Sequence, residues 1–205
     1  MCLHQTMRLA VRGSWALALL AASGTGVGCH SATDPTPPCY VEPPSGTNQA
    51  ALYKVAGPGA CGTGATSVTA VPNGGTFAAT IKLRVKGARP NTAYFVQRAA
   101  EFPPNATSAD TSCQRADQVP PWTAADGFAG PTWVTFPRPY TDQGPPKTLT
   151  TDAAGDGSLD FDYRSPQIPA GTKFDVEMRL VDADTGDEAG VTTELRSGCM
   201  TVLPL

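Results

Sequence analysis

The sequence predicts an all-β domain, an antiparallel β-sandwich of about ten short strands with one long Pro-rich insertion. Glycine and proline, with 21 and 20 copies in 205 residues, make up a fifth of the chain, well above the average for globular proteins. Several segments alternate apolar and polar residues with the period of two that is typical of half-buried strands. Turn sequences rich in Gly, Asn and Asp separate these segments, and no convincing helical period follows residue 30.

The N-terminal residues have the three parts of a bacterial secretion signal. Arg8 and Arg12 form a short positive region, the apolar run 15–22 follows, and small and polar residues come next. The apolar run is too short to cross a hydrocarbon core of about 30 Å. We therefore predict a signal peptide over 1–28, with Met7 as an alternative start.

The end of this signal, Gly26-Val27-Gly28-Cys29, resembles the lipobox of bacterial lipoproteins. The resemblance implies that Cys29 is lipidated, becomes the mature N-terminus and attaches the protein to the membrane of the cell envelope. Gly26 stands where the family usually has leucine, so ordinary cleavage and secretion remain the alternative. Both routes lead to an extracytoplasmic, oxidising compartment in which disulfides persist.

The number of cysteines favours the lipoprotein. Of the six cysteines, Cys2 leaves with the signal, and lipidation of Cys29 would leave an even number. A free Cys29 would leave an odd number, which secreted proteins usually avoid. Since none of the remaining four has the CxxC spacing of metal or thioredoxin-like sites, we predict two disulfides of open connectivity. The disulfide cysteines are Cys39, Cys61, Cys113 and Cys199.

A Pro-rich tether separates the anchor from the domain. Residues 29–46 contain repeated prolines and no apolar period, a composition typical of semi-rigid polyproline II spacers. The chain from 47 to 205 then forms a single β-sandwich domain.

Three segments carry the clearest strand pattern. In 76–87 the apolar side chains Phe77 to Val85 alternate with threonine, lysine and arginine, and 158–163 and 173–180 repeat the pattern. We expect the polar positions of each segment, such as Lys82 or Asp175, to face solvent. Weaker strand candidates are 51–55, 67–71, 93–98, 133–136, 147–151, 191–195 and 200–203.

Turn sequences join these strands into hairpins. Residues 72–75 read PNGG, 154–157 read AGDG and 184–187 read DTGD, all typical of tight turns between antiparallel strands. This order of strands and turns resembles the immunoglobulin-like (Ig-like) or fibronectin-like modules of bacterial surface proteins. The resemblance implies a sandwich architecture and names no enzyme family.

Residues 101–146 interrupt the strand pattern with a Pro-rich insertion that also contains several aromatic residues. Loops of this length are usually functional or disordered, and the aromatic content argues against disorder. Trp122, Trp133 and Tyr140 are the candidate platform for stacking sugar rings. The alternative, which we favour, is that they fill the core beneath the loop.

The residue types exclude most catalytic chemistry. The two histidines are His4 in the signal and His30 beside the anchor, so the domain contains no Ser-His-Asp or Cys-His pair and no histidine-ligated metal. Disulfides would use the remaining thiols. Only hydrolysis by two carboxylates, as in glycosidases, remains as enzyme chemistry, and we predict neither an enzyme nor a cofactor.

Acidic residues near two hairpins give only weak metal candidates. Asp152, Asp156 and Asp160 occupy positions 1, 5 and 9 of a calcium loop, but Ala154 and Tyr163 stand where ligands are required. A hairpin turn is the favoured interpretation, and no metal is predicted. The weak candidates on the next hairpin are Asp182 and Asp184.

Together these observations predict a non-enzymatic cell-envelope lipoprotein that presents a disulfide-stapled β-sandwich for binding or structural support. Its partner would be a protein or polysaccharide at the envelope. The net charge of -3, without a basic and aromatic patch, argues against nucleic acid. The alternatives are a carbohydrate-binding module that uses the loop aromatics and a carboxylate-based hydrolase.

Overall fold

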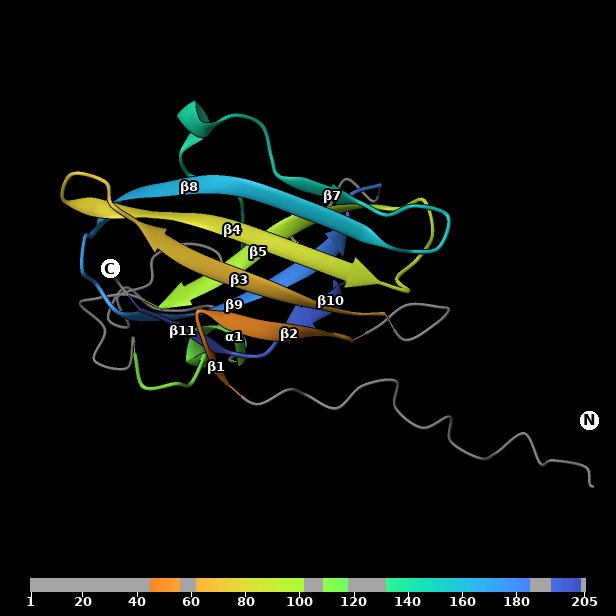
Figure 1. The fold of residues 1–205 in the computed structure, drawn as a ribbon, viewed down its shortest axis with the longest axis horizontal. Helices are drawn as coiled ribbons and strands as arrows, with labels where there is room; N and C mark the ends of the chain where they lie inside the picture. The colour runs from red at the N-terminus through yellow and green to blue at the C-terminus, as the bar shows by residue number, and fades with distance from the viewer. Residues whose placement is uncertain (1–44, 56–61, 102–108, 118–131, 185–192, 204–205) are drawn as a thin grey trace, which may run out of the picture. The chain divides into compact units, whose positions relative to one another are not determined.

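The domain is built almost entirely of strands (Figure 1). The computed structural model describes residues 45–55, 62–101, 109–117, 132–184 and 193–203, all within one compact unit, Thr36–Leu205. The one α-helix among the described residues, α1, covers Gln114–Asp117, and a 3-10 turn covers Thr141–Gln143. The strands are β1 (Gly46–Thr47), β2 (Gln49–Lys54), β3 (Thr63–Val71), β4 (Thr76–Lys86), β5 (Ala93–Glu101), β6 (Val134–Thr135), β7 (Thr148–Thr150), β8 (Gly157–Pro169), β9 (Phe174–Asp182), β10 (Thr193–Ser197) and β11 (Met200–Val202).

Hydrogen bonds join these strands into one mixed sheet of 11 strands with the order β1-β11-β9-β10-β2-β3-β4-β8. Strand β5 pairs with β9 and also with the short strands β6 and β7. Every pair is antiparallel except β1 with β11. The all-β prediction is confirmed. An Ig-like antiparallel sandwich is not, because the pairing runs through all eleven strands and includes a parallel pair.

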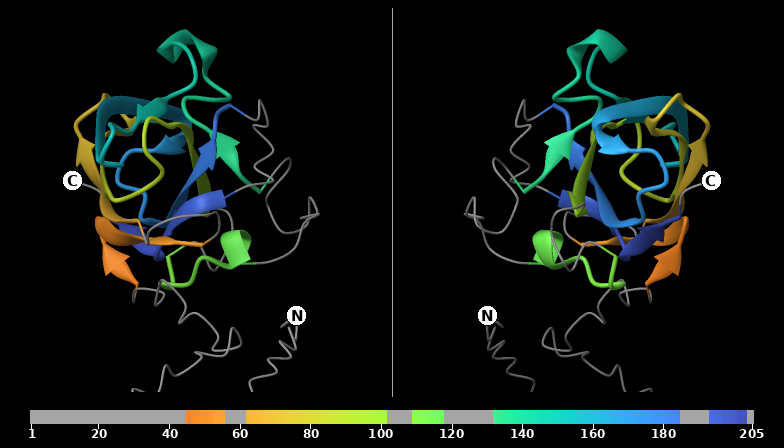
Figure 2. Two further views of the ribbon diagram at one scale, coloured as in Figure 1. Left: turned by 90° about the vertical axis from the view of Figure 1, so that its right-hand side faces the viewer. Right: turned by 90° about the vertical axis from the view of Figure 1, so that its left-hand side faces the viewer.

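The sheet curls so that its two ends approach each other, and the views along the strands in Figure 2 show this curvature. The hairpin between β7 and β8 closes one end through the bridge Thr151–Gly157. In this hairpin Gly155 has φ +82°, and a Cβ there would lie 2.1 Å from the carbonyl oxygen of Ala88. Only glycine fits this contact, because it has no Cβ and adopts positive φ freely.

The outer edge of β8 is covered near its middle by a side chain. The Gln143 amide accepts a hydrogen bond from the Arg164 backbone N–H at 2.8 Å and donates to the Arg164 carbonyl at 2.7 Å. These are the two bonds that a neighbouring strand would make, so the amide substitutes for a strand at this position.

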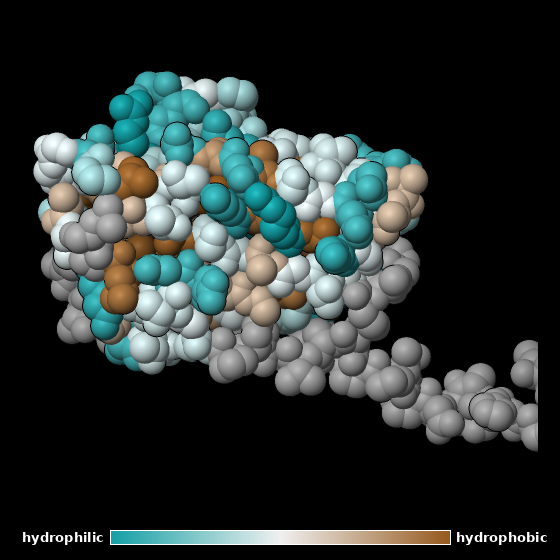
Figure 3. Space-filling model, in the orientation of Figure 1, coloured by the Kyte–Doolittle hydropathy of each residue, from teal (hydrophilic) through white to brown (hydrophobic). Residues whose placement is uncertain are grey.

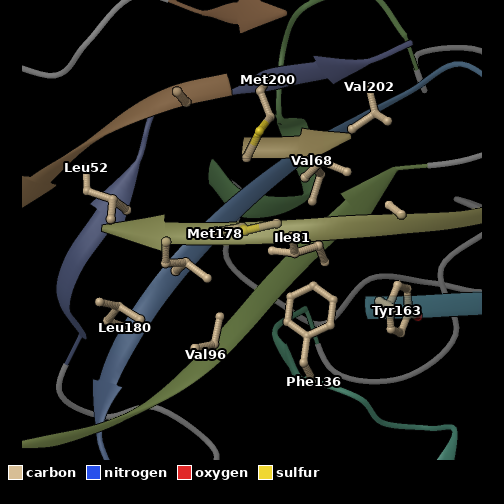
Figure 4. Packing of buried hydrophobic residues seen from close by; sticks show 14 of the residues in the cluster. Leu52, Val68, Ile81, Val96, Phe136, Tyr163, Met178, Leu180, Met200 and Val202 are labelled. Carbon is tan, nitrogen blue, oxygen red and sulfur yellow. The ribbon is translucent and has the colours of Figure 1, made fainter. Parts of the chain in front are cut away.

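Apolar side chains from both halves of the sheet form one core. Side chains from β4, β5 and β9 gather near Ile81, with Phe136 and Tyr163 at one side (Figure 4). The ring of Phe136 packs edge-on against Phe161 and Tyr163, with centroids 5.1 and 5.0 Å apart. Edge-to-face pairs of this kind stabilise a core beyond the area they bury.

The outward face of β4 and β8 is hydrophilic, as the alternation predicts. Figure 3 shows hydrophilic side chains across the face in view. Arg84 forms a salt bridge with Asp160, and Thr80 donates to Asp162 at 2.8 Å. These partners are exposed, so we assign them to solubility and strand register rather than to stability.

The outward face of β9 corrects one prediction. Asp175, Glu177 and Arg179 were expected to face solvent, but every residue of β9 is buried. Part of the predicted insertion covers this face: α1 and Trp133 pack beside Ala99 and the bonded cysteines. Alternation gives the correct face for each side chain but cannot show that a distant segment covers the polar face.

Candidate functional site

The predicted cysteine sites are only partly within the described residues. Cys113 and Cys199 form a disulfide, with their Cα atoms 5.5 Å apart. This bond attaches the segment before α1 to the turn between β10 and β11. Cys29, Cys39 and Cys61 lie outside the described residues.

The five candidate metal-binding aspartates serve in turns and ion pairs. Asp152 accepts the backbone N–H groups of Ala154 and Asp156 at 2.8 and 2.9 Å, and Asp156 accepts that of Gly87 at 3.1 Å. Asp160 pairs with Arg84 on the outer face. Asp182 pairs with Arg89 and accepts the N–H of Asp184 at 2.9 Å. Within the described ranges no cluster of three His, Cys, Asp or Glu side chains could hold a metal ion.

The candidate aromatic platform is divided. Trp122 lies outside the described residues. The guanidinium carbon of Arg179 lies 4.4 Å from the ring centroid of Trp133, so a cation already covers one face of that ring. Tyr140 lies elsewhere, with its hydroxyl 3.0 Å from Ser165 Oγ, and it lines a pocket that Trp133 does not reach.

This pocket, which we call the arginine pocket, has a volume of about 370 Å³. That volume lies in the range of small-molecule sites. It opens between β5, the segment 132–140 and β8. Its lining residues are Arg98, Ala100, Arg115, Thr132, Val134, Arg138, Pro139, Tyr140, Tyr163, Ser165, Gln167 and Ile168.

Arg98 lies at the boundary between this pocket and the core. Its β5 neighbours on the same face, Tyr94 and Val96, belong to the core. Its guanidinium carbon lies 4.3 Å from the centroid of Phe136 and 4.6 Å from that of Tyr163. Nη2 donates to Tyr163 Oη at 2.6 Å and to the Arg138 carbonyl at 2.7 Å. Rings and hydrogen bonds therefore hold the guanidinium plane in one orientation.

The electrostatics of the arginine pocket are cationic. Burial lowers the pKa of Arg98, although arginine stays protonated at neutral pH. The side chains that influence this pKa are the hydroxyls of Tyr163 and Tyr140, and no carboxylate of the described residues is among them. None of the described residues that line the pocket is acidic. The Arg98 cation therefore has hydrogen-bond acceptors but no counter-charge in the described part of the chain.

One hydroxyl of the pocket has no hydrogen-bond partner among the described residues. Thr132 is 6% exposed, and its Oγ1 makes no hydrogen bond to any described residue. A buried hydroxyl in this state is costly, since it has lost water without gaining a partner. An occupant of the pocket that bonds to this hydroxyl would remove the cost.

Two carboxylates lie side by side on β5 and β9, on the face of β5 opposite to Arg98. Glu101 on β5 is the cross-strand partner of Asp175 on β9, and both are 0% exposed. Glu101 Oε1 accepts the backbone N–H of Arg115, and Oε2 has no partner among the described residues. Burial raises the pKa of Glu101 to about 7 and also raises that of Asp175. The hydrolase alternative needs such a pair in an accessible cleft, and these two have no exposed surface.

Glu101 makes stability depend on pH. Its pKa rises from 4.5 to about 7 on folding, so between these values the unfolded chain loses a proton that the folded protein keeps. Stability therefore falls as pH rises through this window, by up to about 3 kcal/mol. We expect Glu101→Gln to reduce this slope, measured by urea unfolding from pH 4.5 to 8, while the contribution of Asp175 remains. The exposed Asp162→Asn is the control, and an unchanged slope in Glu101→Gln would contradict the assignment.

Sequence reasoning missed the arginine pocket. A signal was present, since Arg98 shares a strand face with the apolar Tyr94 and Val96, and an arginine on an inward face is unusual. The opposite wall, from Thr132 to Tyr140 and from Tyr163 to Ile168, comes from segments that only the folded chain brings together.

No helix among the described residues is both long and apolar enough to span a membrane. Comparison with known proteins finds no protein family, no curated protein and no solved structure that this chain matches.

Proposed function

We propose that this protein is a non-enzymatic, extracytoplasmic lipoprotein that binds a small molecule in the arginine pocket. The observation that carries the proposal is the pocket itself: about 370 Å³, with apolar walls and several polar groups directed from different strands. Such a combination is the usual form of a small-molecule site. The anchor at Cys29 and the tether 29–46 would hold this site outside the membrane.

The chemistry of the lining supports binding rather than catalysis. The described residues that line the pocket include three arginines and neither a carboxylate nor a histidine. Guanidiniums orient and neutralise a ligand but do not exchange protons with it as a general base does.

The carbohydrate-binding alternative keeps partial support. Tyr140 lines the pocket together with hydroxyl and amide side chains, which suits a polar ring. The lining does not include Trp133, so a sugar would be held in the pocket rather than on a flat aromatic platform.

Binding is tested by blocking the pocket. Gln167 is exposed and lines the pocket, so Gln167→Trp should fill it without disturbing the core. We expect a panel of sugars, sugar acids and amino acids to contain a compound that raises the melting temperature of the mature chain by several degrees at about 100 Kd. Gln167→Trp should abolish this rise.

The control is Thr69→Trp, a substitution of the same size on the exposed outer face of β3, which should keep the response. Equal responses from the two variants, or no response to any compound, would contradict the proposal. Mass analysis of the mature N-terminus tests the anchor separately: a lipidated Cys29 supports it, and an unlipidated product that begins elsewhere rejects it.

A further inference from the structure

We infer that the ligand of the arginine pocket is a sugar acid, whose carboxylate pairs with Arg98 and whose hydroxylated ring occupies the rest of the cavity. This inference rests on the proposed binding function and names the class of ligand for it.

The pocket contains a cation without a counter-charge among the described residues. Arg98 is a half-buried cation that packs against two adjoining rings and has no carboxylate partner among the described residues. Arg115, which interacts with Glu101, and the exposed Arg138 line the same pocket. Because a charge removed from water is unfavourable unless it is compensated, an anionic ligand would stabilise this arrangement.

The surroundings of Arg98 favour a carboxylate as the bound anion. A guanidinium is planar and keeps its charge, and it binds a carboxylate through charge-assisted hydrogen bonds. Both protons of Arg98 Nη2 are used by Tyr163 and the Arg138 carbonyl, so a carboxylate would pair with this fixed cation through a single bond from Nη1 or Nε. The walls also include Ala100, Val134 and Ile168. Apolar walls favour an organic monoanion over a strongly hydrated phosphate dianion.

The polar side chains of the pocket suit a ligand that carries hydroxyl groups. The hydroxyls of Thr132, Tyr140 and Ser165 and the Gln167 amide line the pocket. Hydroxyl and amide groups can both donate and accept hydrogen bonds, as sugar hydroxyls do. The unpartnered Oγ1 of Thr132 is the group that would gain most from a ligand hydroxyl.

Matched pairs of sugars test the charge. Binding of D-glucuronate and D-galacturonate to the mature chain is measured by calorimetry beside D-glucose, D-galactose and glucose 6-phosphate. We expect at least one uronate to bind, and to bind at least about tenfold more tightly than its neutral sugar and than the phosphate. Arg98→Met should weaken uronate binding by roughly 10- to 100-fold. Arg84→Met, which removes the same charge from the outer face, should not.

Thr132→Val keeps the test decisive if Arg98→Met fails to fold. Valine matches threonine in shape and removes only the unpartnered hydroxyl, so the variant should melt at an equal or higher temperature and still bind uronate several-fold more weakly. Unchanged affinity in this variant would overturn the assigned role of the hydroxyl.

Three results would overturn the inference while the proposed function stands. These are neutral sugars that bind as tightly as their acids, a preference for the phosphate, or binding of other small molecules in the pocket without any uronate. If no compound of the wider panel binds and Gln167→Trp changes nothing, both the inference and the proposed function are wrong.

Discussion

Replacement of Arg89 by methionine is expected to destabilise the folded protein by about 3 kcal/mol. Arg89 Nε donates to Glu194 at 2.7 Å and Nη2 donates to Asp182 at 2.5 Å. The carboxylate side chains are only 1% and 10% exposed, and Tyr94 also donates to Glu194 at 2.8 Å. Methionine would leave both carboxylates without their cation in a site that excludes most water. We take the lower end of the range for buried ion pairs because Arg89 itself is 31% exposed.

Urea unfolding at pH 7 measures this loss, and measurement at pH 4 tests its cause. Arg89 holds the pKa of Asp182 below its usual value, so the wild-type protein loses stability as acid protonates this group. In Arg89→Met the pKa of Asp182 would lose this lowering, so the variant would lose less stability than the wild type as acid protonates this group. The difference in free energy of unfolding between the wild type and Arg89→Met should therefore shrink as the pH falls to about 4.

The exposed pair Arg84–Asp160 provides the matched control. Arg84→Met removes a cation of the same type from a pair in solvent, where it contributes little, and should leave stability almost unchanged. An equal loss for Arg89→Met at both pH values would mean that packing, not charge, is responsible.

Removal of the Cys113–Cys199 disulfide is expected to destabilise the protein by about 4 kcal/mol. The two cysteines are 86 residues apart, and a closed loop of this length restricts the unfolded chain strongly in the loop-entropy description. The bond also holds the segment before α1 against β5 and β9, where Ala99 and Trp133 pack. The double variant Cys113→Ser/Cys199→Ser should show this loss in urea unfolding at pH 7.

Each single serine variant should lose as much stability as the double variant, because either substitution removes the same disulfide. A double variant within about 0.5 kcal/mol of the wild type would indicate that the unfolded chain is already compact or that the native bond is strained. Fluorescence of the tryptophans provides a local readout, since Trp133 packs beside Cys199.

Local patterns predicted the strands well where one face meets solvent. The segment 76–87 became β4, with Phe77, Ile81 and Leu83 buried and Lys82 exposed. The same reasoning failed for the outward face of β9, where Asp175 and Glu177 are buried. Alternation reports polarity but not burial: Asp175 accepts the backbone N–H of Thr111, about 60 residues away in sequence, and Glu177 pairs with Arg196.

Neither the strand order nor the pocket could be predicted from local sequence patterns, because both depend on contacts between distant segments. Hairpin signals are local and predict antiparallel neighbours, but the pairing of β5 with β9 and of β1 with β11 joins distant segments. The pocket depends on those distant contacts, because Arg98 meets Tyr163 only when β5 and β8 lie on the same core. The candidate site predicted from the sequence was an aromatic platform in the insertion; of its three residues Tyr140 lines the pocket, Trp133 does not, and Trp122 lies outside the described residues.

The Gln143 amide that pairs with the Arg164 backbone also limits self-association when many copies of the protein lie close together. An open strand edge is a template on which a second copy can add its own strand, and the proposed lipid anchor would bring copies of the protein together often. At Arg164 that template is occupied by a group from the same chain. A single side chain therefore protects this part of the β8 edge from the intermolecular sheets that lead to aggregation.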